Sequence, residues 1–122
     1  MRTCLIVDGS RVIRRIARGI VEHLAFEVDE AGDGQEALSL CKETMPDAVV
    51  VDWQTPTMDG IEFLKTLRRV PGGEHPKVIF CSQETSLDRI REALAAGADE
   101  YVMKPFDGDI LAGKFALVGL AA

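Results

Sequence analysis

Four short apolar runs in this 122-residue chain each end on a polar residue, and stretches with helical periodicity separate them. The runs are rich in β-branched residues and lack polar alternation, which is typical of strands buried on both faces of a parallel sheet. Parallel strands need long crossover connections, and the helical stretches supply them. The sequence therefore predicts an α/β fold with a doubly wound parallel sheet. The polar residues that end the four runs are Asp8, Asp52, Ser82 and Lys104.

The pattern of a strand followed by a helix repeats five times. The expected strands span residues 3–7, 27–31, 48–51, 78–81 and 100–103. Three of the expected helices span residues 11–24, 60–69 and 109–120. The second helix is expected to begin at Asp33 and to end before Pro46. The fourth is expected to begin at a cap, Thr85 or Ser86, and to end at Gly97. In the first helix, six apolar residues at helical spacing are expected to face the core, namely Ile13, Ile16, Ala17, Ile20, Val21 and Leu24.

Length and composition favour one domain over residues 1–122 with a single core. The formal charge of -6 argues against nucleic-acid binding, and no apolar stretch is long enough to span a bilayer. The three cysteines are odd in number and lack C-x-x-C spacing, so we interpret them as reduced thiols in a cytoplasmic protein. His23 and His75 lack metal-ligand spacing and are expected to be solvated.

The four strand-end residues are expected to meet in one pocket, because ligands of open α/β sheets bind outside the carboxyl ends of the strands. A carboxylate such as Asp52 can attack a phosphoryl group and form an acyl phosphate. That transfer depends on in-line geometry and charge neutralisation, which Mg²⁺ held by Asp8 and Asp52 can supply. Lys104 offers a cation and Ser82 a hydroxyl donor to phosphoryl oxygens. Each residue alone would be interpreted as a strand-end polar group facing water.

Three sequence blocks carry a resemblance to a known family: CLIVD at 4–8, DWQTPTMDG at 52–60 and YVMKPF at 101–106, together with Ser82. The whole chain resembles the receiver domains of two-component response regulators. It is most similar to the single-domain, chemotaxis-type regulators known as CheY-like proteins. The resemblance implies a flavodoxin-like (βα)5 fold with the strand order 2-1-3-4-5.

The resemblance implies a role for each residue of the pocket. Asp52 would accept a phosphoryl group from a histidine kinase or a histidine phosphotransfer protein. Asp8, Asp52 and the backbone carbonyl of Gln54 would bind Mg²⁺ as the cofactor. Lys104 would pair with the phosphoryl group, and Ser82 would move to donate a hydrogen bond to it.

The resemblance also implies a switch and a downstream protein target. Tyr101 would turn inward when Ser82 moves, which would reshape the surface formed by the fourth helix, the fifth strand and the fifth helix. The peptide bond before Pro105 is usually cis in this family, an isomer that X-Pro bonds permit. The side chains of Gln54 and Glu84 would flank the site and tune attack of water on the acyl phosphate.

Gly9 departs from the family pattern, which usually has two adjacent acids after the first strand. The second acid is normally a direct Mg²⁺ ligand, and a charge about 4 Å away at an effective dielectric near 20 is worth a few kcal/mol. We therefore expect Mg²⁺ affinity weakened by about tenfold or more. Three alternatives follow: slow phosphorylation with Asp8 as the remaining ligand, a degenerate receiver that binds partners without phosphorylation, or an introduced substitution that biases the switch. Thr55, where an apolar residue is more usual, is expected to affect loop packing only.

Two helices carry candidate partner surfaces. The first helix has arginines at spacings of three and four, which form either a solvated face or a docking surface for an acidic kinase. Its candidate partner-binding residues are Arg14, Arg15 and Arg18, and Tyr101 is the candidate at the surface of the fourth helix, the fifth strand and the fifth helix. The last helix carries only Lys114 as a charge from residue 110 onward. Its outer face is either a plain Ala/Gly surface or a patch for a partner or a weak dimer.

An enzymatic alternative is a phosphatase of the haloacid-dehalogenase type, which also uses a strand-end Asp, a Ser or Thr, a Lys and Mg²⁺. That class needs a second Asp two residues after the nucleophile as general acid. Gln54 occupies the position here, and an amide cannot exchange a proton in this way. The chain is therefore expected to be a regulator that at most catalyses its own phosphorylation and dephosphorylation.

Overall fold

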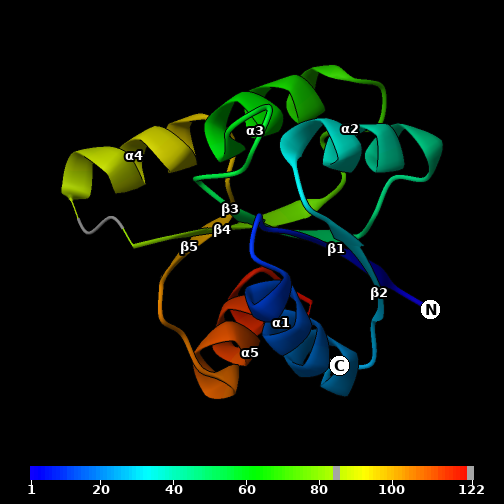
Figure 1. The fold of residues 1–122 in the computed structure, drawn as a ribbon, viewed down its shortest axis with the longest axis vertical. Helices are drawn as coiled ribbons and strands as arrows, with labels where there is room; N and C mark the ends of the chain where they lie inside the picture. Colours follow the sequence, from blue (N-terminus) through cyan, green and yellow to red (C-terminus); the bar gives the residue numbers. More distant parts are fainter. Residues whose placement is uncertain (84–85, 121–122) are drawn as a thin grey trace.

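The computed structural model of the chain describes residues 1–83 and 86–120. Within these residues, five strands and five helices alternate (Figure 1). The strands are β1 (Thr3–Val7), β2 (Glu27–Ala31), β3 (Ala48–Asp52), β4 (Lys77–Ser82) and β5 (Glu100–Met103). The helices are α1 (Arg11–His23), α2 (Gly34–Glu43), α3 (Gly60–Arg69), α4 (Leu87–Ala95) and α5 (Gly108–Leu117).

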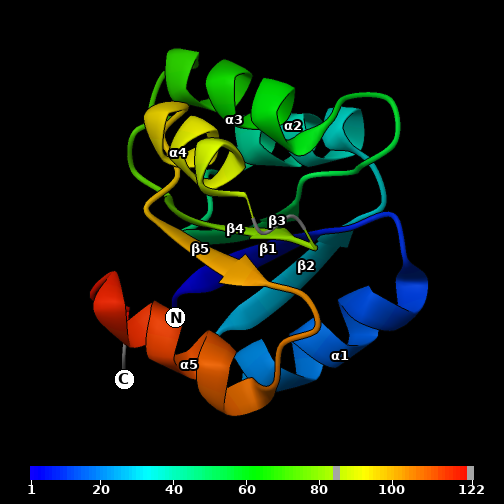
Figure 2. The same cartoon turned by 90° about the vertical axis from the view of Figure 1, so that its left-hand side faces the viewer.

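The five strands form one parallel sheet in the order β2-β1-β3-β4-β5, which confirms the predicted flavodoxin-like topology. Helices α1 and α5 cover one face of the sheet, and α2, α3 and α4 cover the other (Figure 2). The strand register pairs Asp52 with Cys81 and Ser82 with Met103. The carboxyl ends of β1, β3, β4 and β5 therefore meet along one edge of the sheet.

The central strands are buried on both faces, which explains their lack of polar alternation. In β1, Leu5 and Val7 pack with the layer of α2 and α3, whereas Cys4 and Ile6 pack with α1 and α5. The three cysteines are free, as their number and spacing predicted, and all three are buried. None of the helices among the described residues has the length and apolar character that a membrane crossing requires.

Each helix begins with a serine or aspartate whose side chain accepts a hydrogen bond from the backbone N–H three residues later. This arrangement satisfies one of the unpaired donors of the first helical turn. The capping residues are Ser10, Asp33, Asp59, Ser86 and Asp107. Ser86 was one of the two caps predicted for α4, and the other, Thr85, lies outside the described residues.

Two local predictions were wrong. Ile16 was expected in the core, but 52% of its surface is exposed, because the buried stripe of α1 is centred on Ala17 and Val21. One residue along a helix is a rotation of about 100°, which carries Ile16 off that stripe. The last helix ends at Leu117 rather than at residue 120, because Gly119 adopts a positive φ of 83°.

Candidate functional site

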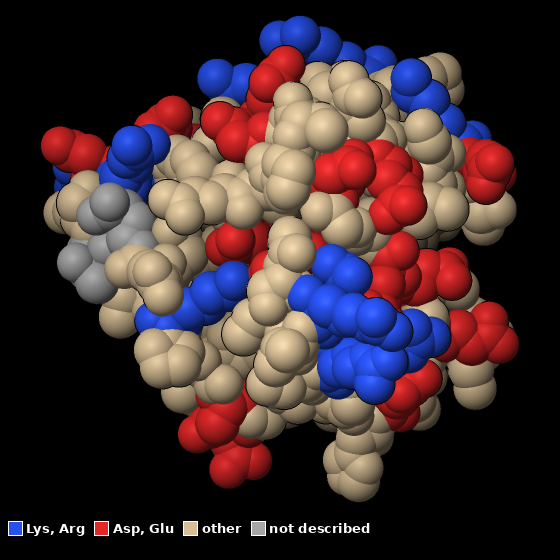
Figure 3. Space-filling view, viewed as in Figure 1, with Lys and Arg blue, Asp and Glu red and all other residues tan. Residues whose placement is uncertain are grey.

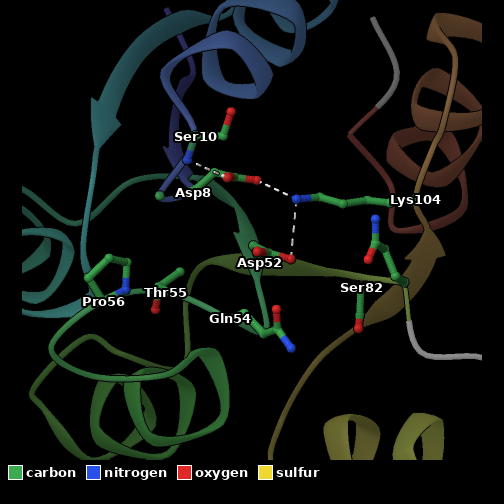
Figure 4. Close-up of a pocket in the computed structure, with 10 residues that line it drawn as sticks. Asp8, Ser10, Asp52, Gln54, Thr55, Pro56, Ser82 and Lys104 are labelled. Carbon is green, nitrogen blue, oxygen red and sulfur yellow. Dashed lines mark hydrogen bonds and ion pairs between the residues drawn. The ribbon is translucent and has the colours of Figure 1, made fainter.

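An open pocket of about 860 Å³ lies at the carboxyl edge of the sheet (Figure 4). The four strand-end residues singled out in the sequence all line it. Further lining residues come from the loops after β1, β3 and β4. The full lining is Asp8, Gly9, Ser10, Asp52, Gln54, Thr55, Pro56, Ser82, Gln83 and Lys104.

One ammonium group joins the two acidic side chains of the pocket. Lys104 Nζ donates a hydrogen bond of 2.6 Å to Asp8 Oδ2 and lies 3.3 Å from Asp52 Oδ1 (Figure 4). The other oxygen of Asp8, Oδ1, accepts a hydrogen bond of 2.8 Å from the backbone N–H of Ser10. Both oxygens of the Asp8 carboxylate therefore have partners, and Asp52 has the more open position.

The pocket changes the acidity of both Asp52 and Lys104. Burial raises the pKa of Asp52, and the negative charge of Asp8 acts in the same direction, while Lys104 opposes both. Burial alone would lower the pKa of Lys104, but its hydrogen bond to Asp8 and the charges of both carboxylates raise it above its usual value. Lys104 is therefore fully charged at neutral pH.

Arg14 supports the pocket from behind, a contact that sequence reasoning missed. Its Nη1 donates to the backbone carbonyl of Asp8 at 2.7 Å, and its Nε donates to Glu30 on β2 at 3.1 Å. Arg18 pairs with the same glutamate. Glu30 therefore holds Arg14 and Arg18, whereas Arg15 is exposed. The docking surface on α1 formed by these three arginines stays a prediction.

Tyr101 lies apart from the pocket and is buried, with only 6% of its surface exposed. Its ring stacks on Phe80 at a centroid distance of 6.2 Å. The side chain therefore points inward in this structure, which is the orientation that the resemblance associates with movement of Ser82. The assignment of Tyr101 as a switch and partner-binding residue stays a prediction. Ser82 is also buried, at the pocket wall, and Glu84 lies outside the described residues.

Two loop features agree with the sequence. The Lys104–Pro105 peptide is cis. The hydroxyl of the buried Thr55 donates to the carbonyl of Met58, a contact within the loop that precedes α3. Thr55 therefore packs its own loop, although it also lines the pocket.

Gly9 lies exposed at the pocket rim, beside Pro56. Because it has no side chain, the pocket contains two carboxylates, and no group of three or more His, Cys, Asp or Glu among the described residues could hold a metal ion. Magnesium is usually bound through one or two carboxylates while it keeps several waters, so the donor set fits a hydrated divalent cation. A cation at Asp8 would compete with Lys104, which already occupies one of its oxygens.

The response regulator receiver domain family matches residues 4–115 of the chain. The chain belongs to this family. The receiver is 38% identical over 111 residues to the chemotaxis protein CheY-3 of Vibrio cholerae, a match that covers 90% of this chain and 85% of that protein. It is 39% identical over 103 residues to the chemotaxis protein CheY of Halobacterium salinarum, covering 84% of this chain and 83% of that protein.

Solved structures give the same result for the fold. The receiver superposes on CheY4 of Vibrio cholerae with a TM-score of 0.91 and 30% identity, covering 97% of this chain and 98% of that one. These findings confirm the resemblance to CheY-like proteins. Receiver domains act in two-component signalling as regulators rather than classical enzymes, and those of the CheY type typically bind Mg²⁺.

Proposed function

We propose that Asp52 is the phosphoryl acceptor of this receiver, with a histidine kinase or a histidine phosphotransfer protein as donor. A carboxylate oxygen of Asp52 attacks phosphorus, the bond from phosphorus to the imidazole nitrogen breaks, and the imidazole keeps the electron pair. The observation that supports this proposal is the position of Asp52 at the end of β3, in an open pocket and 3.3 Å from the Lys104 ammonium.

Lys104 and Ser82 act on the transferred group. The ammonium of Lys104 is charged and already lies between the two carboxylates, so it balances part of the charge that the phosphoryl group brings. The hydroxyl of Ser82 belongs to the same pocket and donates to a phosphoryl oxygen.

Asp8, Asp52 and the backbone carbonyl of Gln54 are the groups that would hold Mg²⁺. When bound, the ion neutralises negative charge on the phosphoryl group. Gly9 lowers the affinity for the ion, because the pocket has one carboxylate fewer and Asp8 is engaged with Lys104.

Aromatic contacts give the pocket a physical route to the surface of α4, β5 and α5. Trp53 follows Asp52 and packs edge-on against Phe80 at 5.1 Å, and Arg89 of α4 lies over its ring at 4.7 Å. Phe80 in turn stacks on Tyr101 of β5. A change at Asp52 therefore shifts the populations of two arrangements of this surface.

The surface of α4, β5 and α5 is the proposed binding site for a downstream target protein, in the cytoplasm and in a chemotaxis-type pathway. Several large apolar side chains are exposed on these three elements, which suits a protein contact. They are Leu87, Leu94, Met103, Ile110 and Leu117. The arginines of α1 as a group, Arg14, Arg15 and Arg18, would form the basic contact for the phosphoryl donor.

Gly9 favours a second candidate function. A receiver with a weakened cation site can act as a binding module whose partner contacts do not depend on phosphorylation. The fold and the exposed apolar residues of α4, β5 and α5 are common to both functions, so phosphorylation itself distinguishes them.

The test is to incubate the chain with acetyl phosphate and Mg²⁺ and to measure the intact mass. We expect the gain of one phosphoryl group in the wild type and no gain in Asp52→Asn. In parallel, Mg²⁺ is titrated by the fluorescence of Trp53, the only tryptophan. Gly9→Asp should tighten the dissociation constant about tenfold, since it restores a charge close to the cation.

Gly9→Asn is the matched control, because it adds the same volume without the charge. That control is needed since a Cβ at residue 9 would lie 3.2 Å from Cδ of Pro56, which is a tight contact. No mass gain at Asp52 in either the wild type or Gly9→Asp would overturn the phosphoryl acceptor. A mass gain in Gly9→Asp alone would favour the binding module for the natural chain.

A further inference from the structure

A groove between α1 and α5 lies on the sheet face opposite to α2, α3 and α4 and shares no lining residue with the phosphoryl pocket. Its volume is about 550 Å³. The lining comes from one side of each helix and from the residue that caps α1. It consists of Arg15, Ile16, Gly19, Ile20 and His23 on α1, Leu24 at its C-terminus, and Gly108, Asp109 and Ala112 on α5.

The floor of the groove is apolar and open. Ile16 is 52% exposed, and Ile20, Leu24 and Ala112 are half-buried. A Cβ at Gly19 would meet nothing within 4 Å, so another chain can approach the backbone there. An exposed isoleucine beside small residues is a surface that gains free energy when a second apolar surface covers it.

The two walls of the groove carry opposite charges. Arg15 is exposed on the α1 wall and Asp109 on the α5 wall. In residues 1–83 and 86–120, neither side chain has a hydrogen bond or an ion pair, whereas the neighbouring Arg14 and Arg18 are held by Glu30. Figure 3 shows basic side chains gathered over α1, acidic side chains at the start of α5 below and to the left, and uncharged surface between them.

We propose that a second copy of this chain occupies the groove. A two-fold axis running along the groove places α1 of one protomer on α5 of its partner, because the rotation exchanges the two walls. Arg15 of one protomer then faces Asp109 of its partner, and the symmetry makes this contact twice. The two Ile16 side chains lie in the covered apolar strip between the walls.

The mixed charge of the groove favours a second copy over an acidic partner protein. An acidic surface would gain from Arg15 but would meet Asp109 as a like charge, which disfavours it. The groove of a second copy carries one positive and one negative wall, so each wall faces a wall of opposite charge. Since the apolar strip is small, the dimer is weak, with a dissociation constant of about 10 µM to 1 mM.

The experiment is sedimentation equilibrium of the full chain up to about 1 mM, with charge-swapped variants. Arg15→Asp and Asp109→Arg should each weaken the dimer about tenfold or more, because each places like charges across the interface. The double variant carrying both changes should return the dissociation constant to within about threefold of wild type, since the pairs re-form with reversed sign. Ile16→Glu should also weaken the dimer, because it buries a charge in the apolar strip.

Leu117→Glu is the matched control, since Leu117 is 72% exposed on α5 but does not line the groove. It should leave the dimer unchanged, and circular dichroism verifies the folding of every variant. A chain that stays monomeric up to about 1 mM would overturn the proposal. A dimer that is lost in Leu117→Glu but unaffected by the charge swaps would also overturn it. The same holds if Arg15→Asp slows phosphoryl transfer while its sedimentation stays the same as that of wild type.

Discussion

Lys104 controls the charge of the pocket at the scale of single residues. Its ammonium bridges Asp8 and Asp52, which come from different strands and would otherwise repel each other in a partly dry site. Asp8 has both oxygens satisfied, whereas Asp52 has a raised pKa because burial disfavours its charged form. Burial therefore destabilises the charged form of Asp52, which suits its proposed role as the phosphoryl acceptor.

Asp52→Asn should increase stability at neutral pH. The native pKa of Asp52 lies above the ordinary value of 3.8, so the folded protein binds the proton more tightly than the unfolded chain. Wild-type stability therefore falls as the pH rises from the ordinary pKa through the native pKa, while the amide does not titrate. The melting temperature of the variant should exceed that of wild type by a few degrees at pH 7.

The same comparison at low pH supplies the control. Below both pKa values the carboxyl is neutral in wild type, so the two proteins should melt at nearly the same temperature. A variant that is less stable than wild type at pH 7 would contradict the raised pKa.

At the scale of elements, α1 is attached to β2 by charge as well as by its apolar stripe. The carboxylate of Glu30 on β2 accepts hydrogen bonds from Arg14 and Arg18 of α1. Arg14 also donates a hydrogen bond to the backbone carbonyl of Asp8. The hydrogen bond from Arg18 is the main cause of a lowered pKa at Glu30, which burial opposes. The position of Asp8 in the pocket is therefore stabilised by contacts with α1 and, through Arg14, with β2.

Glu30→Gln should lower the free energy of unfolding by about 0.5–1 kcal/mol at pH 7, a modest value because the pair is partly exposed and screened by solvent. The lowered pKa means that this stabilisation is present above the ordinary pKa of Glu30 and is lost as the pH falls through the native value. Urea unfolding at pH 7 and at low pH measures the difference.

Glu22→Gln is a suitable comparison for that experiment. Glu22 pairs with Arg18 at the surface, where both side chains are largely exposed, and its loss should be close to neutral. Equal effects of the two substitutions would argue against a structural role for Glu30.

At the scale of the whole molecule, the sheet separates two apolar cores, where chain length had predicted a single one, because a sheet covered by helices on both faces buries apolar side chains on each. Helix α5 completes the core that it shares with α1. Phe115 is fully buried there and meets Phe26 edge-on at a centroid distance of 5.3 Å. Leu117, two residues later, is 72% exposed. The last helix therefore contributes both to the core and to the outer surface.

Phe115→Ala should cost about 3–5 kcal/mol, because it leaves a cavity under α5. Such a loss is a large part of the roughly 5–15 kcal/mol that holds a typical domain folded. Leu117→Ala should change stability by less than about 0.5 kcal/mol. Urea unfolding of the two variants compares them, and a similar loss in both would mean that α5 packs differently.

Much of the fold could be predicted from local pattern. Short β-branched runs, helical periodicity and capping residues act within a few positions of each other, and they located all five strands and helices to within a few residues. The residues of the pocket followed from the rule that carboxyl ends of parallel strands share an edge. Errors arose where tertiary packing decides which residues are buried. Ile16 has the spacing of a core residue but lies beside the buried stripe of α1.

The sequence by itself determined the alternating elements and the parallel sheet, because short-range periodicity and the long crossovers encode them. It also determined the group of residues at the carboxyl edge, because the ends of parallel strands share one edge. The tertiary structure alone decided which charges pair. Lys104 pairs with Asp8, which lies 96 positions away in the sequence. Glu30 forms ion pairs with Arg14 and Arg18 of α1. The ring of Tyr101 points inward and stacks on Phe80. A charged or aromatic side chain has several partners of suitable chemistry along a chain, and only the folded arrangement brings one of them within reach.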